Sequence, residues 1–210
     1  MRTSADSGRR GAVIIETALV TPLLLVILVG IVEMAFLMRD DAAVSSLVHQ
    51  GVRTASSALA TDHEQSHQAS QFCTAPCSVD NAPALADLAV AAIEHADASL
   101  PKDAIDELWI YKANPQGFPG AAGNTRFASC ETACVVYRWS AEHHTFDYVS
   151  GSWRADDIDA CPDSQDTVGV YMKATHSLLT GLISRGINIT DHAVYSFAAL
   201  EPTHCSRSTS

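Results

Sequence analysis

The most apolar part of the chain lies near its beginning. From Ala18 to Met38 every residue is apolar except Thr21 and Glu33. A helix of about 20 such residues matches a hydrocarbon core of roughly 30 Å, so the pattern predicts one transmembrane helix over about 18–38. A cleaved secretory signal is the less favoured interpretation. Its apolar region is shorter, about 7–15 residues, and no small-x-small cleavage site precedes Arg39.

A different pattern follows the apolar stretch. After Asp41 the apolar and small residues are spaced three and four apart, as on one face of an amphipathic helix. These positions are Val44, Leu47, Val48, Gly51, Val52, Ala55, Ala58 and Leu59. We predict one continuous N-terminal helix over 12–60, whose second half packs against the rest of the protein. A transmembrane helix followed by a separate second helix is the alternative.

The remainder of the chain, 61–210, predicts an α+β domain. Residues 78–101 carry a helical pattern of apolar positions that ends at Pro101. Segments rich in Val, Tyr, Phe and Trp predict five strands, at 107–113, 133–140, 145–153, 167–175 and 192–200. A short helix is predicted at 176–188, between the last two strands. We expect a small antiparallel sheet packed on the second half of the N-terminal helix.

The charges indicate on which side of a membrane this domain lies. The segment 1–11 is a basic leader with three arginines, whereas Arg39 is followed at once by Asp40 and Asp41. The positive-inside rule therefore places the N-terminus in the cytoplasm and the domain outside. The chain has 13 basic and 24 acidic residues, a formal net charge of −11, which argues against a nucleic-acid partner.

The cysteines support an exported domain. All six follow the apolar stretch: Cys73, Cys77, Cys130, Cys134, Cys161 and Cys205. An even set on one side of an anchor predicts disulfides formed in an oxidising compartment, and the 15 possible connectivities stay open. A zinc site from His63, His67, Cys73 and Cys77 is the less favoured alternative, because this spacing is not that of a familiar zinc finger.

Other candidate chemistry is weak. The acidic loop 156–166 lacks EF-hand spacing, so a solvated charge run is favoured over a calcium site. The chain has neither a G-x-S-x-G elbow nor a Gly-rich phosphate loop. We therefore expect no metal, no cofactor and no enzymatic activity.

Glu16 is the residue that most needs an explanation. In a helix entered at Ala12 its carboxylate lies only about 6 Å inside the apolar segment. An acid costs roughly 2.5–3.5 kcal/mol at the centre of a membrane helix and less near the edge, so a tolerated interfacial acid is one interpretation. The other requires a cut after Gly11. The new ammonium of Ala12 would then pair with Glu16 of a neighbouring helix, and the pair would set the stagger of the two helices.

The same residues resemble a known family. Gly11 followed by four apolar positions and Glu16 resembles the processing site of type IV prepilins, although Thr17 stands where these prepilins often have an aromatic residue. The wider pattern, GAVIIETALVTPLLLVILVGIVE and then HQGVRTAS, resembles the TadE-like pseudopilins of tight-adherence (Flp) pilus systems. The matching positions are Gly11, Glu16, Ala18, Pro22, Gly30, Glu33, Gly51 and Arg53.

The resemblance implies a pilin-like fold and a role in pilus assembly. A prepilin peptidase would cut between Gly11 and Ala12, and the product would be a minor pseudopilin that supports pilus biogenesis and surface attachment. Its partners would be other pilins and pseudopilins, the assembly machinery and membrane lipid. It would be a single-pass protein of the bacterial cytoplasmic membrane, or part of a surface pilus. A membrane-tethered extracellular binding module that does not polymerise is the main alternative, and an anchored extracytoplasmic enzyme is a weaker one.

Overall fold

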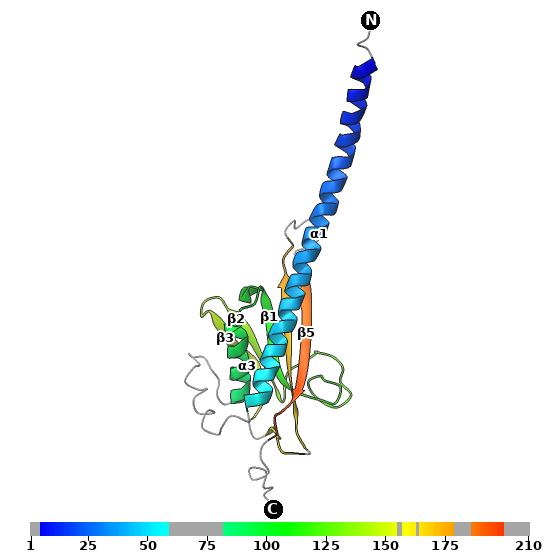
Figure 1. Ribbon diagram of the computed structural model, residues 1–210. Helices are drawn as coiled ribbons and strands as arrows, with labels where there is room; N and C mark the ends of the chain where they lie inside the picture. The colour runs from blue at the N-terminus through cyan, green and yellow to red at the C-terminus, as the bar shows by residue number, and fades with distance from the viewer. Residues whose placement is uncertain (1–4, 59–81, 155–156, 163, 179–185, 200–210) are drawn as a thin grey trace, which may run out of the picture.

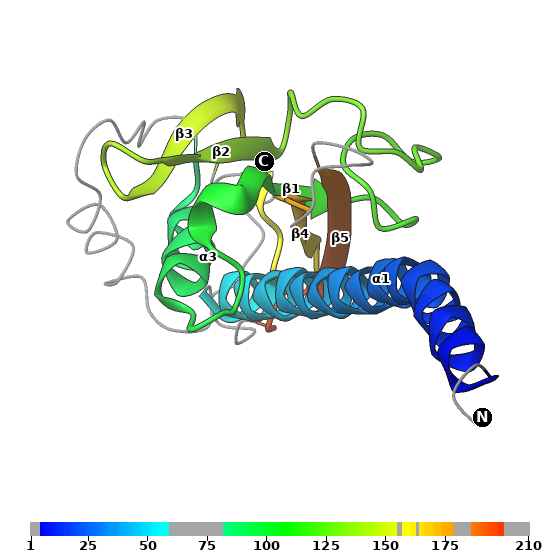
Figure 2. The ribbon, with the colours of Figure 1, turned by 90° about the horizontal axis from the view of Figure 1, so that it is seen from above.

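A long helix, α1, leads from the N-terminal end of the chain into a five-stranded sheet (Figure 1). The computed structural model of the chain describes residues 5–58, 82–154, 157–162, 164–178 and 186–199, with only the backbone described for 5–12. Helix α1 and the shorter helix α3 cover the same face of the sheet, and the first half of α1 projects beyond it (Figures 1 and 2).

Helix α1 extends without a break over Ala5–Ser57. The predicted continuous N-terminal helix is therefore confirmed, although it begins at Ala5 and not at Ala12, and the alternative of two separate helices is wrong. The predicted end at residue 60 lies outside the described residues. Pro22 lies inside α1, where its ring removes one backbone hydrogen bond. Figure 2 shows that the N-terminal end of α1 turns away from the axis of the rest of the helix, a bend of the kind that Pro produces.

The sheet is antiparallel throughout. Its strands lie in the order β3-β2-β1-β4-β5. The bounds are β1 Ile105–Ala113, β2 Cys134–Ser140, β3 Thr145–Ser152, β4 Thr167–His176 and β5 Ile187–Ser196. The first four strands agree with the predicted segments to within two residues. The α+β, pilin-like arrangement of a long helix on a small antiparallel sheet is confirmed.

The last strand was predicted too late in the chain. Strand β5 begins at Ile187, because each of its ten residues pairs with β4, from His176 opposite Ile187 to Thr167 opposite Ser196. The bounds of β5 are therefore decided by its antiparallel pairing with β4 and not by its local composition. The helix predicted at 176–188 is wrong at both ends, which belong to strands, and residues 179–185 lie outside the described part of the chain.

Helix α3 spans Ala84–His95 and ends earlier than Pro101, the predicted stop. The short 3-10 helix η2, Lys102–Ala104, follows it. The Lys102 ammonium donates to the carbonyl oxygens of Ile93 at 2.6 Å and Ala96 at 3.2 Å, at the end of α3, where the helix itself supplies no donors. Burial lowers the pKa of Lys102, while the nearby Glu94 and Asp97 raise it.

Polar contacts also join α3 to the sheet. The Tyr137 hydroxyl of β2 donates to the Asp87 carboxylate at 3.0 Å, and burial raises the pKa of Asp87. Near the other end of α3, Glu94 accepts hydrogen bonds from the Thr145 hydroxyl and the Phe146 backbone of β3. These hydrogen bonds thus fix helix α3 to β2 and to the edge strand β3.

The main core lies between the two helices and the sheet. Strand β4 alternates as a half-buried strand should, and its inward side chains are fully buried: Val168, Val170, Met172 and Ala174. The side chains of α1 that meet them are at most 1% exposed: Val44, Leu47, Val48, Val52 and Ala55. The amphipathic pattern of the second half of α1 is therefore explained by burial against the sheet and α3.

The opposite face of the sheet carries a second, aromatic cluster. Phe127, from the long connection between β1 and β2, stacks on Tyr171 with ring centroids 4.0 Å apart. It also makes edge contacts with Trp109 and Tyr111 of β1. The Tyr111 hydroxyl donates to the Gly117 carbonyl oxygen at 2.9 Å. This connection therefore covers the outer face of the sheet as a folded element.

Candidate assembly segment and its attachment to the domain

The first half of α1 is an apolar rod that nothing in the described chain covers. Every residue from Val13 to Val32 is exposed, and the large apolar side chains among them range from 39% for Val29 and Val32 to 73% for Leu19. Soluble proteins rarely expose so much contiguous apolar surface. By length and composition α1 is able to cross a membrane, and its most apolar window is entirely unburied.

The two threonines in this rod do not interrupt its apolar character. The Thr17 hydroxyl donates to the Val13 carbonyl oxygen at 2.8 Å, and the Thr21 hydroxyl donates to the Thr17 carbonyl oxygen at 2.7 Å. Both hydroxyls are thus satisfied within the helix. They line a shallow, open groove on one side of α1, with Val13, Ile14, Ala18, Pro22 and Leu25.

Glu16 is placed differently from these threonines. Its side chain is exposed, and within the described residues its carboxylate has neither a hydrogen-bond nor an ion-pair partner. The bond between Gly11 and Ala12 lies about one turn before it in α1, where only the backbone is described. The structure thus places a charged group on an otherwise apolar surface. A cation from outside the described chain would pair favourably with this carboxylate in a membrane or a helical bundle.

The second half of α1 is held closely against α3. Gly51, one of the positions that carries the family resemblance, is buried, and a Cβ atom at this position would lie 2.6 Å from Ile93 Cδ1. Gly51 therefore permits the two helices to approach at this point. By contrast, Gly30 in the apolar half of α1 has nothing within 4 Å of the corresponding position.

This difference gives a matched pair of substitutions. Gly51→Leu is expected to lower the free energy of unfolding by about 1–3 kcal/mol, because it overfills the contact with Ile93. Gly30→Leu makes the same chemical change where there is space, and should leave stability unchanged or slightly raised. Urea denaturation of the full chain in detergent micelles, followed by tryptophan fluorescence, measures both. Equal midpoints for the two variants would contradict the close contact at Gly51.

A side-chain hydrogen bond joins α1 to the sheet just after the apolar stretch. His176, the last residue of β4, is 5% exposed, and its Nδ1 donates to an Asp40 carboxylate oxygen 2.6 Å away. The Nε2 atom of the same ring is buried and has no hydrogen-bond partner in the described structure. Asp40 is thus the one polar contact of this imidazole among the described residues. Sequence reasoning missed the pair, since 136 positions separate its members.

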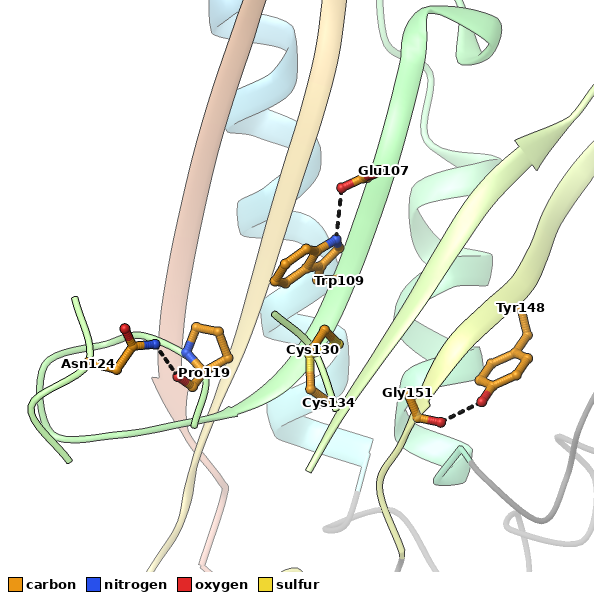
Figure 3. The surroundings of a disulfide bond; sticks show 8 residues. All are labelled: Glu107, Trp109, Pro119, Asn124, Cys130, Cys134, Tyr148 and Gly151. Carbon is orange, nitrogen blue, oxygen red and sulfur yellow. Dashed lines mark hydrogen bonds between the residues drawn. A yellow bond between two sulfur atoms is a disulfide. The ribbon is translucent and has the colours of Figure 1, made fainter. Parts of the chain in front are cut away.

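The cysteines are partly described. Cys130 and Cys134 form a disulfide with their Cα atoms 5.2 Å apart, and Cys161 is also disulfide-bonded. Figure 3 shows the Cys130–Cys134 bridge close to Trp109, at the edge of the aromatic cluster. The bridge therefore fastens the end of the connection that covers the outer face of the sheet to the start of β2. The remaining predicted disulfide cysteines lie outside the described residues: Cys73, Cys77 and Cys205.

The described residues do not assemble a metal site. No group of three or more His, Cys, Asp or Glu side chains suited to a metal ion occurs among them, and His63 and His67 lie outside them. In the acidic loop, the Lys112 ammonium lies 2.7 Å from the Asp166 carboxylate and donates to the Asp157 carbonyl oxygen at 3.2 Å. The cation that contacts the described part of this acidic loop is thus the side chain of Lys112, from β1.

These features define a class of protein. A long helix with an exposed apolar first half, and a second half packed on an antiparallel sheet, is the arrangement of a pilin-like protein. Within this class, residues 11–53 match the family model described as TadE-like protein. The family resemblance of the N-terminal segment is therefore confirmed over these residues. Comparisons with curated proteins and with solved structures give no match.

Proposed function

We propose that the chain is a minor pseudopilin of a tight-adherence (Flp) pilus system. The observation that carries this proposal is the coincidence of the family match over 11–53 with an apolar helix that is exposed from Val13 to Val32. The protein first spans the cytoplasmic membrane once, with its N-terminus in the cytoplasm. A prepilin peptidase removes the leader 1–11 between Gly11 and Ala12. The apolar rod then packs against the helices of other pilins or pseudopilins.

Glu16 has a defined task in this proposal. After cleavage, the ammonium of Ala12 on one subunit pairs with the Glu16 carboxylate of its neighbour. Two opposite charges 4 Å apart attract by about 4 kcal/mol at an effective dielectric constant of 20. The exposure of Glu16, with no partner in its own described chain, leaves the carboxylate available for this contact. The exported domain then has a structural and attachment role, and we expect neither catalysis nor nucleic-acid binding.

The mature N-terminus is the direct test. Intact-mass spectrometry of the protein from its own cells is expected to give a chain that begins at Ala12. Gly11→Leu should block removal of the leader, whereas Gly11→Ala, which adds one methyl group, should block it less. Recovery of the chain with Met1 and its leader intact would contradict the proposal and favour a membrane-tethered binding module that does not polymerise.

A further inference from the structure

The exposure of α1 changes abruptly along its length. Every residue of the apolar rod from Val13 to Val32 is exposed, and Glu33, which is half-buried, is the first that is not. One turn further, Leu37 is also half-buried and packs against the main core. The domain thus begins to cover α1 inside the apolar stretch Ala18–Met38. Between Arg10, the last charge of the leader, and Glu33 lie 22 residues, a helical length of roughly 33 Å. The described side chains among them, Val13–Val32, are all exposed.

This length is close to the thickness of a hydrocarbon core, roughly 30 Å. If this part of α1 spans a bilayer, no further exposed stretch of the helix remains as a spacer between the hydrocarbon and the domain. Nor does α1 contain a hinge at this point, since neither Pro nor Gly occurs between Gly30 and Gly51.

The sheet is fixed along α1 at both of its ends. At the end nearer the apolar rod, His176 of β4 pairs with Asp40. At the far end, the Ala198 backbone donates to the Ser56 carbonyl oxygen at 2.9 Å. Figure 1 shows the adjoining ends of β4 and β5 as the part of the sheet that reaches furthest along α1 toward its N-terminus. A bilayer around the exposed half of α1 would therefore be nearest to this end of the sheet.

We propose that the exported domain is seated directly on the outer leaflet, with the adjoining ends of β4 and β5 against the lipid headgroups. The inference rests on the proposed function, since it requires that α1 spans the bilayer. It moves the span to Val13–Val32. Glu33 then lies at the outer boundary of the hydrocarbon, and Glu16 stays about 4–5 Å inside the inner boundary. Exposed apolar side chains on the uncovered sides of α1, Phe36 at 40% and Met38 at 63%, face the headgroup layer.

Strand β5 offers a matched pair of reporter positions. Ile187 lies at the membrane end opposite His176, and Tyr195 lies near the other end opposite Val168. Their exposed fractions are nearly equal, 38% and 37%. Because they are eight residues apart they point to the same face of the strand, with about 27 Å between them. A tryptophan at either position therefore differs from the other mainly in its distance from the bilayer.

The test uses the full chain reconstituted in phosphatidylcholine vesicles, with and without a nitroxide on the lipid headgroup. Ile187→Trp is expected to show quenching above that of the parent protein, and Tyr195→Trp is not. A third variant, Leu25→Trp, reports the span itself, since a nitroxide deep in the acyl chain should quench it.

The outcomes separate the membrane span of α1 from the seating of the domain on the leaflet. If Leu25→Trp is quenched but Ile187→Trp is quenched no more than Tyr195→Trp, the domain stands away from the leaflet and the seating is wrong, while the span survives. If Leu25→Trp escapes deep quenching, α1 does not cross the bilayer, and the seating is overturned with it.

Discussion

Replacing Glu16 by alanine is expected to leave leader removal intact and to reduce incorporation into fibres at least tenfold. The reason is electrostatic. A neighbour's Ala12 ammonium that loses its carboxylate stays unpaired in an apolar bundle, and an attraction of about 4 kcal/mol corresponds to a factor of roughly 1,000 in an equilibrium. The peptidase acts before this contact forms, so the mature mass should match that of a chain beginning at Ala12 with the substitution. Immunoblots of sheared surface fibres and of the membrane fraction measure the two effects separately.

Thr17→Ala is the matched control. Thr17 is adjacent in the same exposed turn, and its hydroxyl is satisfied by the Val13 carbonyl oxygen of its own helix. Loss of that hydroxyl should leave both cleavage and incorporation near the parent level. Normal incorporation of the Glu16→Ala protein would remove the assembly role of Glu16. Equal losses for both variants would instead indicate that the surface of the rod matters and the carboxylate does not.

The local patterns of the sequence predict those parts of the structure that local interactions decide. The apolar run and the three-and-four spacing predict α1, because each depends on residues within a few turns. The first four strands are predicted for the same reason, since alternation such as that of Val168, Val170 and Met172 reflects one buried face. Glu16 was singled out as an acid inside an apolar stretch, and the resemblance to type IV prepilins gave Gly11 its predicted role. The structure adds to this that Glu16 is exposed on an uncovered helix.

The features that were missed depend on contacts between distant segments. Pairing with β4 decides where β5 begins, and Lys102 supplies partners to the end of α3 from the other side of a turn. The connection between β1 and β2 is rich in Gly and Pro, and this composition does not predict how the connection folds. In the fold, the side chains of Asn114 and Asn124 bind its backbone at several points. None of these contacts leaves a periodic signal in the sequence.

The contact between Asp40 and His176 also joins distant segments, and its loss should clearly lower the stability of the domain. Asp40→Ala is expected to lower the free energy of unfolding by about 1–3 kcal/mol, because a buried imidazole then loses its hydrogen-bond partner. Asp41→Ala is the control. It removes the same charge from the next residue, whose side chain is exposed. Urea midpoints of the full chains in detergent micelles provide the comparison.

A double variant separates the pair from other effects at Asp40. With leucine at position 176 there is no imidazole that could lose its hydrogen-bond partner. In that background Asp40→Ala should therefore lower the free energy of unfolding much less. If Asp40→Ala costs the same with leucine at position 176 as with His176, the two residues are not coupled, and apolar packing alone holds this end of the sheet to α1. If the costs differ as expected, a single side-chain hydrogen bond between Asp40 and His176 helps to fix the domain to the helix that carries it, just after the apolar stretch of α1.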